Sequence, residues 1–129
     1  MTPEKLIELA KEAMTHSYSP YSGYKVGAAL LCGDGTVYTG CNIENAGYSA
    51  TVCAERTAVF KAVSEGHRRF KRIVVAGRSD SPCVPCGECR QVLSEFSPEL
   101  EVICLDKDGN ELALSLTDLL PHSFNKSFL

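Results

Sequence analysis

Cys53-Ala54-Glu55 is followed about thirty residues later by Pro85-Cys86-Gly87-Glu88-Cys89, and these two stretches decide how the chain folds around a metal. Cys86 and Cys89 are three positions apart, so they lie on one side of a helical turn and can both reach the same ion. Cys53 adds a third thiolate from a distant part of the chain. Three protein ligands leave one tetrahedral position of zinc open, which is the arrangement of catalytic rather than structural sites.

Glu55 stands two residues after Cys53, in the first turn of a helix that we predict over residues 54–64. A glutamate in a first turn is common, because the helix dipole stabilises it. With Cys53 bound to zinc, however, the Glu55 carboxylate lies beside the open position, where it can move protons between water and a substrate. Glu55 is therefore the predicted catalytic residue.

Arg56 is a candidate for balancing the charge of the metal site. Three thiolates and Zn²⁺ sum to one negative charge, which weakens the ability of the ion to acidify water. We expect the Arg56 guanidinium to offset this charge by donating hydrogen bonds to the ligand sulfurs. The alternative is a surface arginine in an ordinary salt bridge.

Cys83 allows an alternative set of metal ligands. Cys83, Cys86 and Cys89 form a C-x2-C-x2-C run that resembles part of an iron–sulfur ligand set, but position 93, where a fourth cysteine would stand, is Leu. A closed zinc site that also used Cys53 and Cys83 would lack the two regular C-x2-C pairs of a zinc ribbon. We favour the open site, with Cys83 as a spare thiol nearby. The other cysteines are predicted in the core of the sheet: Cys32, Cys41 and Cys104.

The hydrophobic pattern predicts alternating helices and strands. The expected helices cover residues 3–14, 54–64, 87–96 and 115–120. The expected strands cover residues 25–32, 36–41, 72–76, 101–105 and 111–114. This order is typical of a three-layer α/β/α fold, with a mixed sheet of about five strands and helices on both faces. We expect residues 1–129 to form a single catalytic domain.

Composition and charge exclude some classes of binding partner for this chain. It has 129 residues, of which 44% are hydrophobic, and a formal net charge of -3. Nucleic-acid-binding proteins usually carry a basic face, so this charge argues against such a partner. No stretch resembles a signal peptide or approaches the ~20 apolar residues of a membrane span. Clustered cysteines indicate metal ligands in a reducing compartment, so we expect a cytoplasmic protein.

The metal-binding stretches, Cys53-Ala54-Glu55-Arg56-Thr57-Ala58 and Pro85-Cys86-Gly87-Glu88-Cys89-Arg90-Gln91, resemble those of the small cytidine deaminases. The likeness runs nearly from end to end. The zinc motif is common to the whole deaminase superfamily, whereas Asn42-Ile43-Glu44-Asn45 is specific to the branch that acts on free nucleosides. The resemblance implies a zinc-dependent hydrolase of pyrimidine salvage, which deaminates free cytidine and deoxycytidine to uridine and deoxyuridine.

The resemblance also implies contacts with the substrate. Asn42 and Glu44 would hydrogen-bond the sugar, chiefly its 3′-hydroxyl, and Tyr24 would pack near the base or the sugar. Glu55 would also hold the ring nitrogen beside the amine, and Ala54 would belong to the same site. The residues alone leave a plainer alternative open, in which Asn42 is a turn residue and Glu44 a solvated loop charge.

Members of this family are typically homotetramers with one zinc ion per subunit, and neighbouring chains complete each site. By this likeness Ala46 and Tyr48 would reach a neighbour's nucleoside, and Phe124 would stack on its base. Two positions depart from the family pattern: Tyr24 stands where Phe is usual, and Cys83 is an added cysteine.

Other functions share the zinc core. The alternative substrate is a modified cytosine nucleoside or a nucleoside antibiotic, and Tyr24 with the sugar-binding loop would decide between the two. Editing of a polynucleotide is disfavoured by the acidity of the chain. A purely structural zinc module would make Glu55 dispensable.

Overall fold

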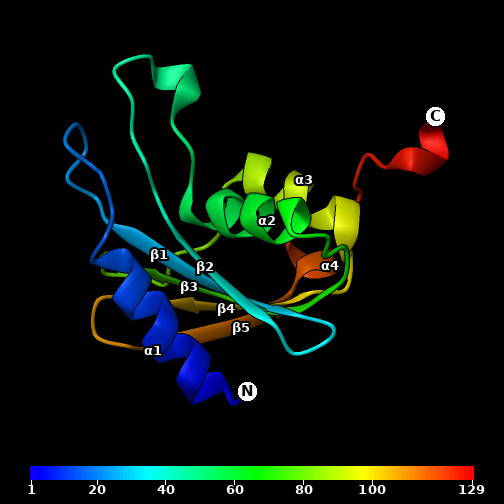
Figure 1. Ribbon diagram of the computed structural model, residues 1–129, viewed down its shortest axis with the longest axis horizontal. Coiled ribbons are helices and arrows are strands. Elements are labelled where there is room, and N and C mark those ends of the chain that lie inside the picture. The colour runs from blue at the N-terminus through cyan, green and yellow to red at the C-terminus, as the bar shows by residue number, and fades with distance from the viewer.

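Five strands form one mixed sheet in a computed structural model of the protein, which describes residues 1–129 (Figure 1). The strands are β1 (Val26–Cys32), β2 (Val37–Cys41), β3 (Phe70–Gly77), β4 (Glu101–Leu105) and β5 (Glu111–Ser115). Their order across the sheet is β2-β1-β3-β4-β5. Only β3 and β4 pair in parallel, and the other neighbours are antiparallel. The connection from β3 to β4 is therefore a crossover between parallel neighbours, and it carries the second metal-binding stretch.

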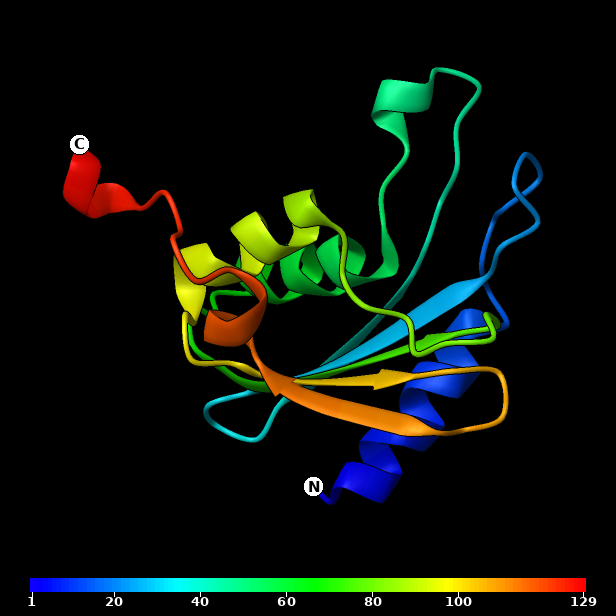
Figure 2. The ribbon, with the colours of Figure 1, turned by 180° about the vertical axis from the view of Figure 1, so that it is seen from behind.

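Helices cover both faces of the sheet (Figures 1 and 2). They are α1 (Pro3–Met14), α2 (Ala54–Ser64), α3 (Gly87–Phe96) and α4 (Leu116–Leu119), with short 3-10 turns at Tyr48–Ala50 and Lys126–Phe128. One face packs on α1, and the other packs on α2, α3 and α4. This arrangement is the predicted α/β/α fold with its five-stranded mixed sheet. The longest helix has 12 residues, and none combines the length and the hydropathy that a membrane span requires.

Strand β1 is apolar throughout because it is buried on both faces. Along β1, Ala28 and Leu30 belong to the core under α2 and α3, whereas Ala29 and Leu31 face α1. Side chains of a strand alternate between faces, so a strand covered on both sides shows no polar alternation. All seven residues of β1 are buried.

Several element boundaries differ from the sequence-based expectation. Strand β3 begins at Phe70 and ends at Gly77, so it is longer than residues 72–76. Helix α4 starts after Ser115, because the Ser115 hydroxyl accepts a hydrogen bond from Thr117 N and caps the helix. Of the three cysteines predicted in the core, Cys32 and Cys104 are buried; Cys41 is only half-buried because β2 lies at the edge of the sheet.

Helix α2 approaches the sheet most closely at Gly40 of β2. A β-carbon at this position would lie 2.6 Å from both Ala54 O and Ala58 N. The Thr57 hydroxyl donates a hydrogen bond to Cys41 O at 3.0 Å in the same place. The missing side chain thus allows the first turn of α2 to lie directly on the strand.

We expect Gly40→Ala to lower the free energy of unfolding by about 1–3 kcal/mol, because overpacking against main-chain atoms displaces the helix. Urea or thermal denaturation measures this change. Gly33→Ala in the β1–β2 turn is the matched control, since a β-carbon there meets no atom closer than 3.5 Å. Equal stability of the two variants would contradict the close contact.

Candidate active site

Cys53 and Cys86 occupy equivalent positions, each as the N-cap residue of a helix. Their backbones are extended, with ψ of 158° and 168°, and neither side chain makes a capping hydrogen bond to its own helix. N-cap side chains commonly accept a hydrogen bond from the first turn, so these thiols are left for another partner. Both sulfurs also lie at the partially positive end of a helix.

The sulfurs of Cys53, Cys86 and Cys89 form a cluster whose members all lie within 4.8 Å of one another. Cys53 Sγ and Cys86 Sγ are 3.8 Å apart. Zinc–sulfur bonds of about 2.3 Å in a tetrahedron separate two sulfurs by about 3.8 Å, so the spacing suits zinc. Cys83 lies outside the cluster, so the three thiols that the structure brings together are those predicted for the open site.

Arg56 lies between the sulfur cluster and an acidic side chain. Its Nη2 donates a hydrogen bond to Cys53 Sγ at 3.4 Å, and its Nη1 pairs with the Glu88 carboxylate. Its Nε is buried and has no hydrogen-bond partner. Hydrogen bonds from the Cys89 thiol and from Arg56 hold the pKa of Cys53 well below its usual value, which favours a thiolate at this position. Arg56 thus makes both interactions considered from the sequence, a bond to a ligand sulfur and a salt bridge.

Glu55 is the second residue of α2 and is only 4% exposed. Burial raises the pKa of its carboxyl group to about 7. Groups with a pKa near the working pH exchange protons most effectively in both directions. Glu55 also shares a cavity with Cys53 and Cys86, so its carboxyl group and two of the clustered thiols open into the same space.

This cavity has a volume of about 290 Å³ and collects residues from four separate parts of the chain. Four predicted substrate-binding residues line it: Tyr24, Asn42, Glu44 and Ala54. The remaining lining residues are Ser22, Val26, Thr51, Val52, Cys53, Glu55, Cys83, Val84 and Cys86. Of these, Ser22, Val26, Thr51, Val52 and Val84 had no predicted role.

The other three predicted substrate-binding residues do not line the cavity of their own chain. Ala46 and Tyr48 belong to the segment between β2 and α2, which projects from the body of the protein (Figures 1 and 2). Tyr48 is 78% exposed there. Phe124 lies on the C-terminal tail and is 58% exposed; its carbonyl accepts a hydrogen bond from Gln91 of α3.

Asn42 is a buried structural link rather than a simple turn residue. Its Nδ2 donates to Tyr24 O at 2.8 Å, and its Oδ1 accepts from Val26 N at 3.0 Å and from the Ser17 hydroxyl. An asparagine amide carries two N–H groups, so one hydrogen of Nδ2 remains available to a ligand.

The carboxylate of Glu44 is held by the turn that precedes β1. Its Oε1 accepts from Tyr21 N at 2.9 Å and from Ser22 N at 3.1 Å, and its Oε2 accepts from the Ser22 hydroxyl. The Ser22 hydroxyl lowers the pKa of Glu44, which keeps the side chain ionised. The sequence contains Ser22 in the turn signal Pro20-Tyr21-Ser22-Gly23, but no spacing connects that turn with Glu44.

Comparison with known proteins supports this description of the site. Residues 1–105 match the family described as the cytidine and deoxycytidylate deaminase zinc-binding region. The chain is 49% identical to a cytidine deaminase of Sporosarcina psychrophila, over 100% of this chain and 96% of that one. A cytidine deaminase crystal structure from Burkholderia pseudomallei has 49% identity and a TM-score of 0.93, over 96% of this chain and 100% of that one. The chain thus belongs to a zinc-binding family, and the cluster of Cys53, Cys86 and Cys89 is suited to holding the ion.

We expect Cys86→Ser to abolish stoichiometric zinc binding, because two thiolates remain where the open site needs three. Cys83→Ser is the matched control and should retain zinc, since Cys83 lies outside the cluster. Metal analysis of the purified variants by mass spectrometry measures both. Loss of zinc from Cys83→Ser with retention in Cys86→Ser would overturn the ligand set.

Proposed function

The chain belongs to the cytidine deaminase family, and we propose that it hydrolyses free cytidine and deoxycytidine to uridine and deoxyuridine, with release of ammonia. The observation that carries this proposal is the buried carboxylate of Glu55 in the same cavity as the metal ligands Cys53 and Cys86. A zinc site with three protein ligands and an adjacent carboxylate suits hydrolytic deamination of a cytosine ring.

Proton transfer through Glu55 is the contribution of the chain itself to the reaction. Zinc, when bound, supplies Lewis acidity that lowers the pKa of water. Glu55 accepts one proton as the water oxygen adds to C4 of the base, and passes it to the ring nitrogen beside the amine. It then accepts the second water proton from the hydroxyl now on C4 and passes it to the departing amine, so that one water is consumed and one ammonia leaves. A carboxyl pKa of about 7 is suited to both directions of transfer.

The size and chemistry of the cavity favour a free nucleoside. Its volume of about 290 Å³ is at the lower end for small-molecule sites. We propose that the free Nδ2 hydrogen of Asn42 and the ionised carboxylate of Glu44 bind the sugar hydroxyls, while Tyr24 and Ala54 border the base and the sugar. The net charge of -3 argues against a nucleic-acid strand as the substrate.

We further propose that the protein acts as a homotetramer in which neighbouring chains complete each site. Support comes from Ala46, Tyr48 and Phe124, which lie outside the cavity of their own chain, two of them as exposed aromatic residues. Exposed aromatic side chains are frequent anchors of protein interfaces. In this arrangement Phe124 stacks on the base bound by a neighbour.

The setting of the activity is also part of the proposal. The three zinc ligands must be reduced thiolates, and the cytoplasm keeps thiols reduced. We therefore propose a cytoplasmic enzyme of pyrimidine salvage, with residues 1–129 as a single catalytic domain and without a nucleic-acid or membrane partner. All five strands belonging to one sheet support the single domain.

We expect Glu55→Gln to retain zinc and to lower kcat for cytidine by about 10²–10⁴-fold, because the amide cannot carry the proton. Ultraviolet absorbance follows the conversion of cytidine to uridine. Glu65→Gln, an exposed position at the end of α2, is the matched control and should remain fully active. Near-normal turnover by Glu55→Gln would refute this role. A zinc-loaded wild type inactive on cytidine but active on a modified cytosine nucleoside would favour the alternative substrate.

If neighbouring chains complete each site, two variants with different defects should restore activity to each other in a mixed oligomer. We expect Phe124→Ala to raise KM for cytidine roughly tenfold through lost stacking. Co-expression of Phe124→Ala with Glu55→Gln should produce mixed oligomers in which some sites combine an intact Glu55 with an intact Phe124 from the neighbour. Activity at limiting cytidine should then exceed the average of the two variants alone. Strictly average activity would show that Phe124 acts within its own chain.

A further inference from the structure

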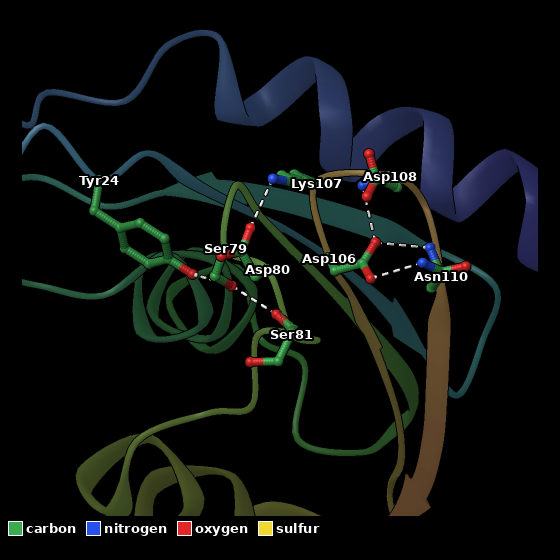
Figure 3. Close-up of polar contacts among 8 residues, drawn as sticks. All are labelled: Tyr24, Ser79, Asp80, Ser81, Asp106, Lys107, Asp108 and Asn110. Atoms are coloured by element: carbon green, nitrogen blue, oxygen red, sulfur yellow. Dashed lines mark hydrogen bonds and ion pairs between the residues drawn. The ribbon is translucent and has the colours of Figure 1, made fainter.

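The hydroxyl of Tyr24 is hydrogen-bonded to Ser79, a residue that does not line the substrate cavity. Tyr24 Oη donates a hydrogen bond to Ser79 Oγ at 3.1 Å, and Ser79 Oγ donates to Ser81 O at 2.6 Å (Figure 3). A serine hydroxyl has a single proton. Because Ser79 uses that proton on Ser81 O, it is the acceptor for Tyr24, and the direction of the chain is determined.

Gly77, the last residue of β3, provides the space into which the hydroxyl reaches. A β-carbon on Gly77 would lie 2.5 Å from Tyr24 Oη and 2.9 Å from Cys83 Cβ. The tip of Tyr24 and the side chain of Cys83 thus fill the place of a missing side chain. Burial raises the pKa of both Tyr24 and Cys83, as expected for groups partly removed from water.

The loop that carries Ser79 rests on the turn between β4 and β5. Lys107 N donates to Ser79 O at 3.0 Å, and Cys83 N donates to Leu105 O at 3.1 Å. The buried Asp106 carboxylate stiffens this turn by accepting from Asp108 N, Asn110 N and Asn110 Nδ2, each at 2.9 Å (Figure 3). Main-chain bonds, rather than the exposed ion pair of Lys107 with Asp80, therefore hold Ser79 in place.

The main chain of Tyr24 is held by the residues assigned to the sugar. Tyr24 O accepts from Asn42 Nδ2 at 2.8 Å, and Tyr24 N donates to the Ser22 hydroxyl at 3.0 Å. Ser22 in turn donates to Glu44. Tyr24 is thus fixed at its backbone by the sugar side of the cavity and at its hydroxyl by Ser79.

We propose that Ser79 is a positioning residue that holds the ring of Tyr24 as a wall of the substrate cavity and so sets the affinity for the nucleoside. This inference rests on the proposed function. Ser79 does not line the cavity, and it contacts neither Glu55 nor the zinc ligands. Its loss should consequently weaken binding of the nucleoside and leave the chemical step unchanged.

The test compares Ser79→Ala, Tyr24→Phe and the double variant in steady-state kinetics with cytidine. Each single change should raise KM by roughly three- to tenfold, the effect of one neutral hydrogen bond, while kcat stays within roughly twofold. The double variant should match the single variants, because both remove the same bond. Ser79→Thr keeps a hydroxyl at this position, so its KM should equal that of the wild type. Ser81→Ala is the matched control, since Ser81 accepts through its main-chain oxygen.

Three outcomes would overturn the inference: additive effects in the double variant, a loss confined to kcat, or an unchanged KM in Ser79→Ala. Calorimetric titration with uridine measures the same affinity without turnover. A matching loss of uridine affinity would support the role of Ser79 even if cytidine were not converted, and unchanged affinity would refute it. Absence of cytidine conversion by the zinc-loaded wild type would instead count against the proposed function.

Discussion

The first turn of α2 lies on the main chain of β2, and the positions of Cys53 and Glu55 depend on that contact. Gly40 has no side chain to hold the two apart, and Ala54 and Ala58 are small enough to be completely buried against the strand. The helix start consequently cannot shift without moving Cys53, its N-cap residue, and Glu55, which lies one residue inside it. A close fit of backbone to backbone therefore controls where the Cys53 thiol and the Glu55 carboxyl group stand relative to the sheet.

Local patterns predicted most of the fold and the three cysteines that the structure brings together, whereas contacts across long separations escaped prediction. The convergence of Cys86 and Cys89 follows from helical periodicity and N-cap geometry, which depend only on neighbouring residues. The link from Tyr24 to Ser79 joins residues 55 positions apart, and that from Ser22 to Glu44 joins residues 22 apart. Such pairs arise only after the sheet has assembled, so no spacing in the sequence marks them. The tertiary packing also explains why Cys41, on an edge strand, is less buried than its apolar neighbours suggested.

The charge around the metal site comes from Arg56 and Glu88 as well as from the cysteines. One nitrogen of Arg56 contacts the sulfur of Cys53, and another contacts the carboxylate of Glu88 on α3. The guanidinium thus links the first turns of two helices while opposing the negative charge of the thiolates. Because Glu88 draws on the same cation, the compensation available to the sulfurs is smaller than a dedicated arginine would supply. How strongly Arg56 offsets the charge of the sulfurs therefore depends on Glu88 of α3 as well as on the cysteines themselves.

The two N-cap cysteines also act as the ends of a loop. Cys53 and Cys86 are 33 residues apart, and the chain between them contains α2 and β3, the central strand of the sheet. A bridge that closes a loop of this length removes conformational entropy from the unfolded chain worth about 4 kcal/mol. Zinc bound between the helices is therefore also a cross-link around the middle of the fold, and the free energy of binding it contributes to folding. Resistance to heat in this protein should accordingly follow the supply of metal as well as the packing of its core.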